Sequence, residues 1–291
     1  MRISYVTSSH NGIASFRYRV ESIGKELSER GHHVTVSPKA DKEADAVIFS
    51  KHWTFNDASY MEFCKLRGQK AIFDICDDHF RKAPLGDHYR RMAKSADIVT
   101  VNSVEMQKRV QEEAWVPSIV IPDPVLGTRR MYDESKQLLL GWFGQSMNIP
   151  GLYEAYPAGA QIPLLIAIPG RLEPPEYFNR PWIQWLQWHP EVIAEMAEVC
   201  SGFILPYRQL KPAKSANRVL EAIWAGCPVL TDPLPAVQEI PSGWRALDPA
   251  LKVVRELEAD WTEEMMAAQD WIQKHYSVKA ITDQWEAVLN G

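Results

Sequence analysis

The stretch K-P-A-K-S-A-N-R-V-L-E-A-I-W-A-G-C-P-V-L, residues 211–230, predicts a helix, its anion-binding end and the strand that follows. Ser215 is a favourable N-cap, and residues 216–225 are all helix-tolerant with one apolar face. Gly226 then ends the helix, because glycine commonly occupies the position after a helical C-terminus. Residues 227–231 have the short apolar pattern of a buried strand.

Basic residues gather at the start of this predicted helix, where unpaired backbone N–H groups and the positive dipole end favour an anion. Lys214 and Arg218 oppose the helix dipole there, so a bound phosphate explains them better than helix stability does. Glu221 lies one turn after Arg218, where a carboxylate can accept hydrogen bonds from both ribose hydroxyls. The alternative is an ordinary amphipathic helix with a solvated basic end.

The pattern V-L-E-A-x-x-A-G-x-P-V, preceded by polar and basic residues, resembles the donor site of the GT-B-fold glycosyltransferases related to glycogen synthase and sucrose synthase. That family has two glutamates eight positions apart, the second of which holds the ribose of the nucleotide-sugar. The resemblance assigns this role to Glu221. The position of the first glutamate, which faces the sugar, holds Ala213 instead.

A chain of 291 residues suits two domains, and the family resemblance extends over nearly all of it. We expect an α/β protein with two Rossmann-like, doubly wound parallel sheets facing across a cleft. The expected domains are an acceptor-side domain at 1–130 and a donor domain at 131–275, with a last helix at 276–291 that crosses back to the first domain. The polar, proline-bearing segment 122–136 is the expected linker.

The first expected loop, after the strand at 2–6, carries one glycine, Gly12, and lacks the G-x-G-x-x-G pattern of dinucleotide-binding proteins. The segment N-G-I-A-S-F-R-Y-R-V is similar to the first loop and helix of the resembled family, where the glycine lets the backbone approach the donor phosphates. Arg17 and Arg19 are candidates for binding a phosphate of donor or acceptor. A solvated face at the start of the helix is the alternative for each.

A cluster of acidic residues follows the expected strand at 70–75. Asp74, Asp77, Asp78 and His79 lie within six positions, a density that also occurs in metal sites. Their place after a strand of a regular Rossmann-like domain argues against a metal, and the resemblance puts them on the wall of the interdomain cleft. Asp77 and Asp78 are therefore our candidates for acceptor contact or general base, with helix N-capping as the alternative.

The second half restarts with the apolar run L-L-L-G-W-F and a turn, G-Q-S-M-N. In the resembled family this turn faces the donor phosphates, so Gly144, Gln145 and Ser146 are candidate ligands through backbone N–H groups and short polar side chains. Trp188 falls where the family places a loop against the nucleobase, and its indole can stack on a base. Core packing is the alternative for this tryptophan.

Charge and cysteine content limit which partners and which cellular location we expect for this protein. Residues 1–130 hold 20 Lys and Arg against 17 Asp and Glu, whereas residues 131–291 hold 12 against 20. Neither half is strongly basic, so we expect no nucleic acid partner, although the first domain can meet a membrane surface peripherally. The four cysteines are far apart, and no secretory or membrane-spanning pattern occurs, so we expect a cytoplasmic protein without disulfides.

The resemblance thus implies sugar transfer from a nucleotide diphosphate sugar to a glycan, glycolipid or other acceptor, without metal or other cofactor and with retention of anomeric configuration. Lys214, Ser215 and Arg218 would neutralise the departing diphosphate. Two alternatives remain open at this stage. One is a sugar-nucleotide epimerase or hydrolase of the same shape, and the other is a non-catalytic subunit that keeps the fold.

Overall fold

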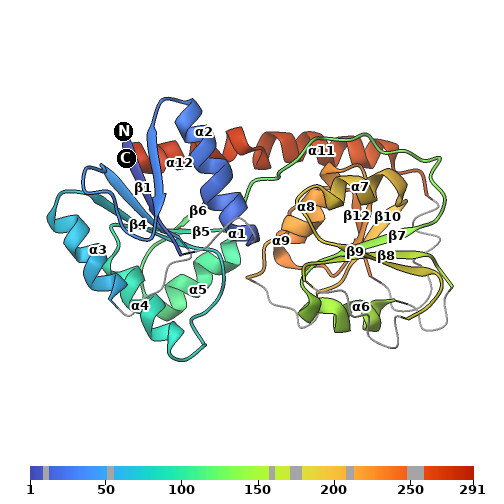
Figure 1. The fold of residues 1–291 in the computed structure, drawn as a ribbon, viewed down its shortest axis with the longest axis horizontal. Coiled ribbons are helices and arrows are strands. Elements are labelled where there is room, and N and C mark those ends of the chain that lie inside the picture. Colours follow the sequence, from blue (N-terminus) through green and yellow to red (C-terminus); the bar gives the residue numbers. More distant parts are fainter. Residues whose placement is uncertain (9–12, 51–55, 157–160, 171–178, 208–212, 248–258) are drawn as a thin grey trace. The chain divides into compact units, whose positions relative to one another are not determined.

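The computed structural model describes residues 1–8, 13–50, 56–156, 161–170, 179–207, 213–247 and 259–291. The chain folds into two compact units, and Figure 1 labels the helices and strands of each. The first unit comprises Met1–Leu126, Pro212–Ser215 and His275–Gly291, and the second comprises Gly127–Lys211 and Ala216–Lys274. The predicted α/β class with two Rossmann-like parallel sheets is confirmed.

The first unit is built on a six-stranded parallel sheet with the strand order β2-β1-β3-β4-β5-β6. The chain therefore moves outward from β1 in both directions, as in doubly wound folds. Its strands are β1 (Arg2–Val6), β2 (His33–Ser37), β3 (Ala46–Ser50), β4 (Lys70–Ile75), β5 (Ile98–Val101) and β6 (Ile119–Val120). Its helical segments are α1 (Ala14–Phe16), η1 (Arg17–Glu21), α2 (Ser22–Glu29), α3 (Asp57–Leu66), α4 (Leu85–Ser95), α5 (Val104–Ala114) and α12 (Val278–Asn290).

Alternation along the central strands divides the core of the first unit into two layers. Ala46 and Ile48 of β3 join one buried cluster, and Val47 and Phe49 join the other, because successive side chains of a strand point to opposite faces. All five residues of β3 are buried, as expected for a parallel sheet covered on both faces.

Helix α12 belongs to the first unit although it ends the sequence. Figure 1 shows this helix beside α2, and the two helices are in contact. Ile281, Trp285 and Leu289 of α12 enter the buried cluster that also contains Tyr5 and Ile23. The last helix thus completes the hydrophobic core of the unit in which the chain begins.

The second unit repeats the same architecture with the strand order β12-β11-β10-β7-β8-β9, again parallel throughout. Its strands are β7 (Leu140–Phe143), β8 (Leu164–Ile168), β9 (Ile183–Gln187), β10 (Gly202–Leu205), β11 (Val229–Thr231) and β12 (Trp244–Ala246). Its helical segments are η2 (Ser146–Asn148), α6 (Ile149–Ala155), α7 (Val192–Val199), α8 (Asn217–Trp224), α9 (Pro235–Gln238) and α11 (Thr262–Tyr276), the last of which extends two residues past the unit boundary.

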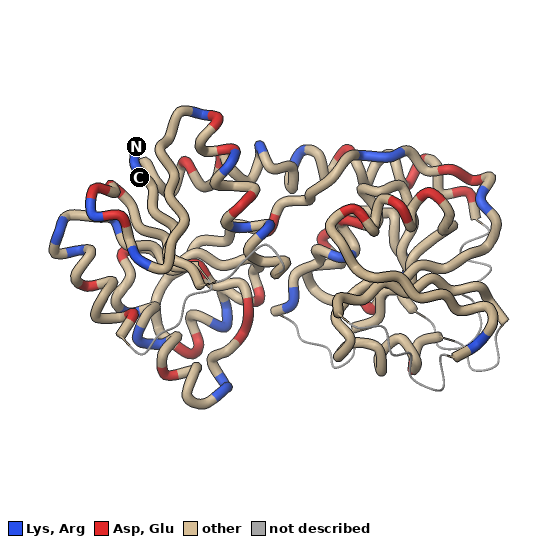
Figure 2. The backbone as a smooth tube through the Cα atoms, viewed as in Figure 1, with Lys and Arg blue, Asp and Glu red and all other residues tan. Residues whose placement is uncertain are grey.

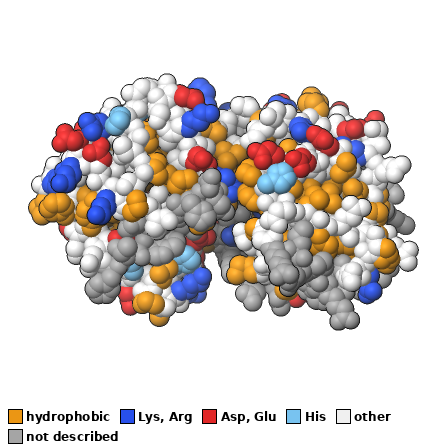
Figure 3. Space-filling model, viewed as in Figure 1, with side chains coloured by type: hydrophobic (Ala, Val, Ile, Leu, Met, Phe, Trp, Pro, Cys, Tyr) orange, Lys and Arg blue, Asp and Glu red, His pale blue; other side chains and the backbone are white. Residues whose placement is uncertain are grey.

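Charged residues lie mainly on helices and loops, and the strands of both sheets are almost free of them in Figure 2. The face drawn in Figure 3 mixes basic, acidic and apolar side chains. Among the described helices, none is both long and apolar enough to cross a membrane.

Candidate functional site

The strand order of the second unit defines a switch point between β7 and β10. From β7 the chain first adds β8 and β9 on one side, then returns to add β10, β11 and β12 on the other. In open parallel sheets, ligands bind outside the carboxyl ends of the strands at such a point. The residues that follow β7 and β10 are therefore candidates for a ligand-binding site.

Arg218 of α8 joins the ends of these two strands. Its Nη1 donates to the carbonyl oxygen of Phe143 at 3.2 Å, and its Nη2 donates to that of Pro206 at 3.2 Å. The guanidinium also lies over the ring of Tyr207, 4.6 Å from the ring centroid. A fixed, half-buried positive charge thus stands at the switch point of the second sheet.

The turn after β7 leaves room for this cation. A Cβ atom added to Gly144 would lie 3.1 Å from Nη1 of Arg218 and 3.2 Å from the ring of Trp142. Glycine therefore permits the close approach of the guanidinium to the turn. Gln145 and Ser146, the other two predicted ligands here, are exposed. The structure brings Gly144 and Arg218 together, and Gln145 and Ser146 follow directly in the chain.

Tyr207 and Asp232 also belong to this region, and the sequence analysis missed both. The Tyr207 backbone N–H donates to Asp232 Oδ2 at 2.7 Å, which links the segments that follow β10 and β11. Burial raises the pKa of Tyr207, while the neighbouring Arg218 acts in the opposite direction. The signal that marks them is their position, since each is a polar residue just after a buried strand.

Glu221 is half-buried one turn after Arg218 on α8. Its carboxylate is close enough to raise the pKa of Tyr207, although less than burial does. Arg218 and Glu221 are three positions apart, so the helix presents a guanidinium and a carboxylate on the same side. This arrangement matches the predicted pairing of a phosphate ligand with a ribose ligand, without testing it.

The predicted cap at Ser215 is wrong. Helix α8 begins at Asn217 with Ala216 as its N-cap, and no side chain caps it. Ser215 is half-buried and Lys214 exposed, and both belong to the short segment grouped with the first unit. Ala213, at the position of the family's first glutamate, is partly buried against the core of that unit. Of the predicted cationic cap, Arg218 alone belongs to the second unit.

Trp188 follows β9, and its backbone N–H donates to the carbonyl oxygen of Ile168 at 2.8 Å. This bond places the tryptophan at the carboxyl end of β8, the neighbour of β7. The residue is half-buried, so part of its surface is accessible to a ligand.

In the first unit, Arg19 is not available to a phosphate, contrary to our prediction. The side chain is 1% exposed and pairs with Asp74 at 2.5 Å and with Asp123 at 2.8 Å. Its Nη1 also donates to the carbonyl oxygen of Ile121 at 2.9 Å. Burial opposes the charge of Arg19, but the two carboxylates outweigh it and raise the pKa of the guanidinium.

Asp74 gathers further hydrogen bonds from neighbouring strands. The hydroxyl of Ser50, the last residue of β3, donates to its Oδ2 at 2.9 Å, and that of Thr100 on β5 donates to its Oδ1 at 2.8 Å. Together with the contacts of Arg19, these bonds join β3, β4 and β5 to η1. Arg19 and Asp74 therefore form a structural centre beneath the carboxyl edge of the first sheet.

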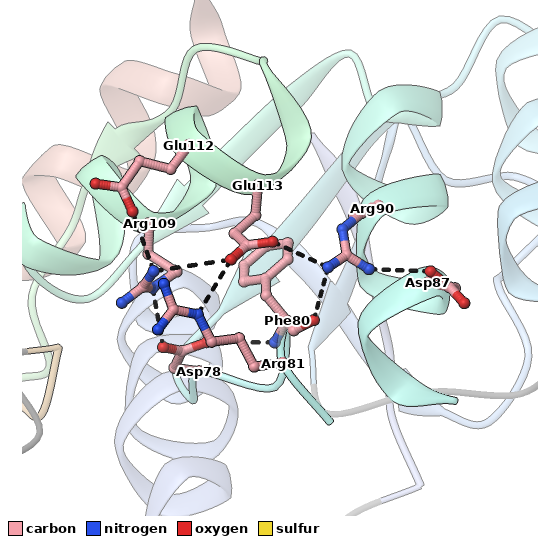
Figure 4. Close-up of polar contacts among 8 residues, drawn as sticks. All are labelled: Asp78, Phe80, Arg81, Asp87, Arg90, Arg109, Glu112 and Glu113. Atoms are coloured by element: carbon pink, nitrogen blue, oxygen red, sulfur yellow. Dashed lines mark hydrogen bonds and ion pairs between the residues drawn. The ribbon is translucent and has the colours of Figure 1, made fainter. Parts of the chain in front are cut away.

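Asp78 is tied into a surface network of ion pairs, drawn in Figure 4. Its Oδ2 accepts from Arg109 Nε at 3.1 Å, and its Oδ1 accepts from the backbone N–H of Phe80 at 3.2 Å. Glu113 in turn accepts from Arg90 at 2.9 Å and from Arg81 at 3.3 Å. This network joins the loop after β4 to α4 and α5, and it gives Asp78 a cationic partner other than a substrate.

The alternative of helix capping by Asp77 or Asp78 is also wrong, because α4 begins at Leu85 with Pro84 as its N-cap. Asp77 is half-buried next to Asp78 in the sequence and remains a candidate for an acceptor contact. Arg17 is half-buried with its guanidinium 5.9 Å from the ring centroid of Tyr18. Gly12 lies outside the described residues. Within those residues, no group of three or more His, Cys, Asp or Glu side chains is placed to hold a metal ion.

Comparison with proteins of known structure identifies the architecture: the chain has the GT-B fold of nucleotide-sugar glycosyltransferases. HepE from Anabaena, whose structure contains UDP and glucose, aligns over 100% of this chain and 99% of its own, with a TM-score of 0.71 and 12% identity. WaaG, a glycosyltransferase of lipopolysaccharide biosynthesis, aligns over 100% of both chains with a TM-score of 0.61 and 14% identity.

An α-glucosyltransferase in complex with UDP-glucose and DNA is a third similar structure. It aligns over 100% of this chain and 98% of its own, with a TM-score of 0.67 and 11% identity. No protein-family model and no curated protein sequence matches the chain. At identities this low, the structural similarity defines the fold and does not define the residues of the site.

Proposed function

We propose that this protein transfers a sugar from a nucleotide diphosphate sugar to an acceptor. The observation that carries the proposal is Arg218, a cation hydrogen-bonded to the ends of both strands that flank the switch point of the second sheet. Proteins with the same fold have been crystallised with UDP or UDP-glucose. A preorganised cation stabilises the negative charge that develops on a departing diphosphate.

The proposed donor site uses the residues around this cation. Arg218 and Lys214 neutralise the diphosphate, and the N–H groups and short side chains of Gly144, Gln145 and Ser146 contact its oxygens. Glu221 holds the ribose, and Trp188 stacks on the base. Since side chains supply the positive charge, we propose that no divalent metal is required. Turnover that is unchanged by EDTA is the expected result.

We propose that the first unit binds the acceptor, a glycan or a lipid-linked sugar, and that a nucleic acid is not the substrate. The formal net charge of −5 opposes the sequence-independent attraction on which nucleic acid binding depends. Asp77 and Asp78 are our candidates for contact with the acceptor hydroxyl, and Asp78 also pairs with Arg109. Retention of the anomeric configuration remains part of the proposal and is read directly by NMR of the product.

The first experiment is a calorimetric titration with UDP, GDP, ADP and dTDP. We expect one of them to bind with a dissociation constant between micromolar and millimolar. Absence of binding by all four would remove the main support for a transferase. Turnover of the matching nucleotide-sugar without any sugar acceptor would instead identify a hydrolase or epimerase.

The ribose role of Glu221 has its own test. The Glu221→Ala variant should bind UDP about tenfold more weakly, because a charge-assisted hydrogen bond contributes about 1.5–3 kcal/mol. It should bind 2′,3′-dideoxyuridine diphosphate as the unmodified protein does, since that ligand lacks both hydroxyls. An equal loss for both nucleotides would show that Glu221 does not contact the ribose.

A further inference from the structure

A buried oxygen atom at the carboxyl edge of the first sheet lacks a hydrogen-bond partner among the described residues. It is Oδ1 of Asn102, which directly follows β5 and is 5% exposed. The Nδ2 of the same amide donates to the carbonyl oxygen of Cys76 at 3.0 Å. The carbonyl oxygen of Cys76 can only accept a hydrogen bond, so the amide atom that faces it must be the nitrogen. Oδ1 is therefore the atom of the Asn102 amide that lacks a partner.

Buried acceptors in folded proteins are nearly always paired, so Oδ1 of Asn102 needs a donor from outside the chain, either a water or a ligand. Asn102 is well placed for such a donor. Ile75 and Val101 are paired across β4 and β5, and Cys76 and Asn102 therefore leave adjacent strands at the edge where parallel sheets bind ligands.

The surroundings of Asn102 determine which ligand chemistry fits. Asp77 follows Cys76, and an ionised carboxylate only accepts hydrogen bonds. Burial raises the pKa of Tyr89 most strongly, and Cys76 and Asp77 add to this rise. The ring of His79 lies 5.4 Å from that of Tyr89. Two oxygen acceptors that follow adjacent strands favour a neutral compound with several hydroxyl groups and disfavour an anion.

We propose that Asn102 Oδ1 and the Asp77 carboxylate accept hydrogen bonds from hydroxyl groups of the sugar acceptor. This subsite lies wholly within the first unit, and its assignment to an acceptor rests on the function proposed above. It adds Asn102 to the residues that bind the acceptor.

Cys76 provides a reporter for this subsite, because it is half-buried whereas the other three thiols, Cys64, Cys200 and Cys227, are buried. The rate of Cys76 alkylation by iodoacetamide can be followed by peptide mass spectrometry, with glutathione in the same sample as a reference thiol. The probes are the methyl glycosides of glucose, galactose, mannose and N-acetylglucosamine, each at 50 mM (roughly fiftyfold above a dissociation constant of about 1 mM).

At least one glycoside should slow alkylation of Cys76 about threefold or more relative to glutathione, as expected when a ligand occupies most of the sites. The Asn102→Ala and Asp77→Asn variants should lose this protection, whereas Asp87→Asn, an exposed carboxylate on α4, should keep it. If Asn102→Ala fails to fold, Asp77→Asn carries the test. An internal water that satisfies Oδ1 would leave all four glycosides without effect and overturn the proposal, as would equal protection in the variants.

A parallel titration with UDP separates this inference from the proposed function. Binding of UDP without protection of Cys76 would support the donor site and contradict the proposed acceptor subsite. Protection of Cys76 by a glycoside without binding of any nucleoside diphosphate would support the subsite and contradict the proposed transferase function.

Discussion

Arg19 and Arg218 both occur near the start of helical segments, yet their partners give them different roles. Arg19 is buried between two carboxylates and has a structural function, whereas Arg218 is half-buried among backbone carbonyls and an aromatic ring. Sequence spacing cannot distinguish the two cases, because Asp74 and Asp123 are 55 and 104 positions away from Arg19. Only the folded chain shows that the charge of Arg19 is already neutralised.

The Arg19→Met variant should destabilise the first unit by about 3–5 kcal/mol, because it leaves Asp74 and Asp123 buried without their cation. Thermal unfolding followed by circular dichroism measures this loss. Arg17→Met, two positions away and half-buried, is the matched control and should change stability by no more than about 0.5 kcal/mol. Unfolding of Arg19→Met at the temperature of the unmodified protein would contradict the assignment.

Among the elements, the buried strands were the easiest to predict. The predicted strands at 2–6 and 70–75 coincide with β1 and β4, because strands covered on both faces are rich in apolar side chains. Strand β12, with the sequence W-R-A, was missed because three residues at a sheet edge carry no pattern. Helix α6 was missed because its sequence, I-P-G-L-Y-E-A, contains proline and glycine, although proline is compatible with a first helical turn.

Only those residues of the candidate site that belong to a sequence motif could be proposed from the sequence. Arg218 and Glu221 were proposed from the motif at 211–230, and Gly144 from the separate turn after the apolar run L-L-L-G-W-F. Tyr207, Asp232 and Asn102 belong to no motif, and only the strand order shows that Tyr207 and Asp232 follow neighbouring strands. The misplaced cap at Ser215 reflects a helix that begins one residue later than predicted, at Asn217, where no capping side chain is present.

The end of α8 offers a test of how the helix packs. Gly226 has φ +86°, and a Cβ there would lie 2.6 Å from the carbonyl oxygen of Met131. Gly170, in the same unit with φ +89°, has nothing within 4 Å of its Cβ position. Alanine at either site is strained by the positive φ. Alanine at 226 also displaces the segment around Met131, whose carbonyl oxygen lies too close to the position of the added methyl group.

We therefore expect Gly226→Ala to cost at least about 2 kcal/mol more than Gly170→Ala, the usual size of an overpacking penalty. Urea denaturation of the two variants measures the difference in the free energy of unfolding. Equal losses would mean that the segment around Met131 moves aside freely.

At the scale of the whole molecule, α12 attaches the end of the sequence to the first unit. Glu286 of this helix accepts from Arg30 at 2.7 Å and contacts His32 at 3.0 Å. Hydrogen bonds from His32 and then Arg30 lower the pKa of Glu286 below its usual range. The stabilisation from this carboxylate is therefore complete above its unfolded pKa of about 4.3 and is lost as the pH falls through its lower folded value.

The unmodified protein should thus unfold at a higher temperature than Glu286→Gln at pH 7, and this gap should close as the pH falls below about 4.3. Glu29→Gln, an exposed glutamate of α2, should show little difference at any pH. Thermal unfolding between pH 3 and pH 7 provides the comparison. A gap that widens in acid would reverse the inferred sign of the effect.

The central claim is that Arg218 holds the diphosphate of a donor, and calorimetric affinities for UDP and for uridine test it most directly. Arg245→Met is the matched control, because this arginine of the same unit also stacks on an aromatic ring, 4.4 Å from the centroid of Trp261. Arg218→Met should weaken UDP binding about 10- to 100-fold and leave uridine binding unchanged, while Arg245→Met should alter neither. A folded Arg218→Met protein that binds UDP as tightly as the unmodified chain would contradict the claim.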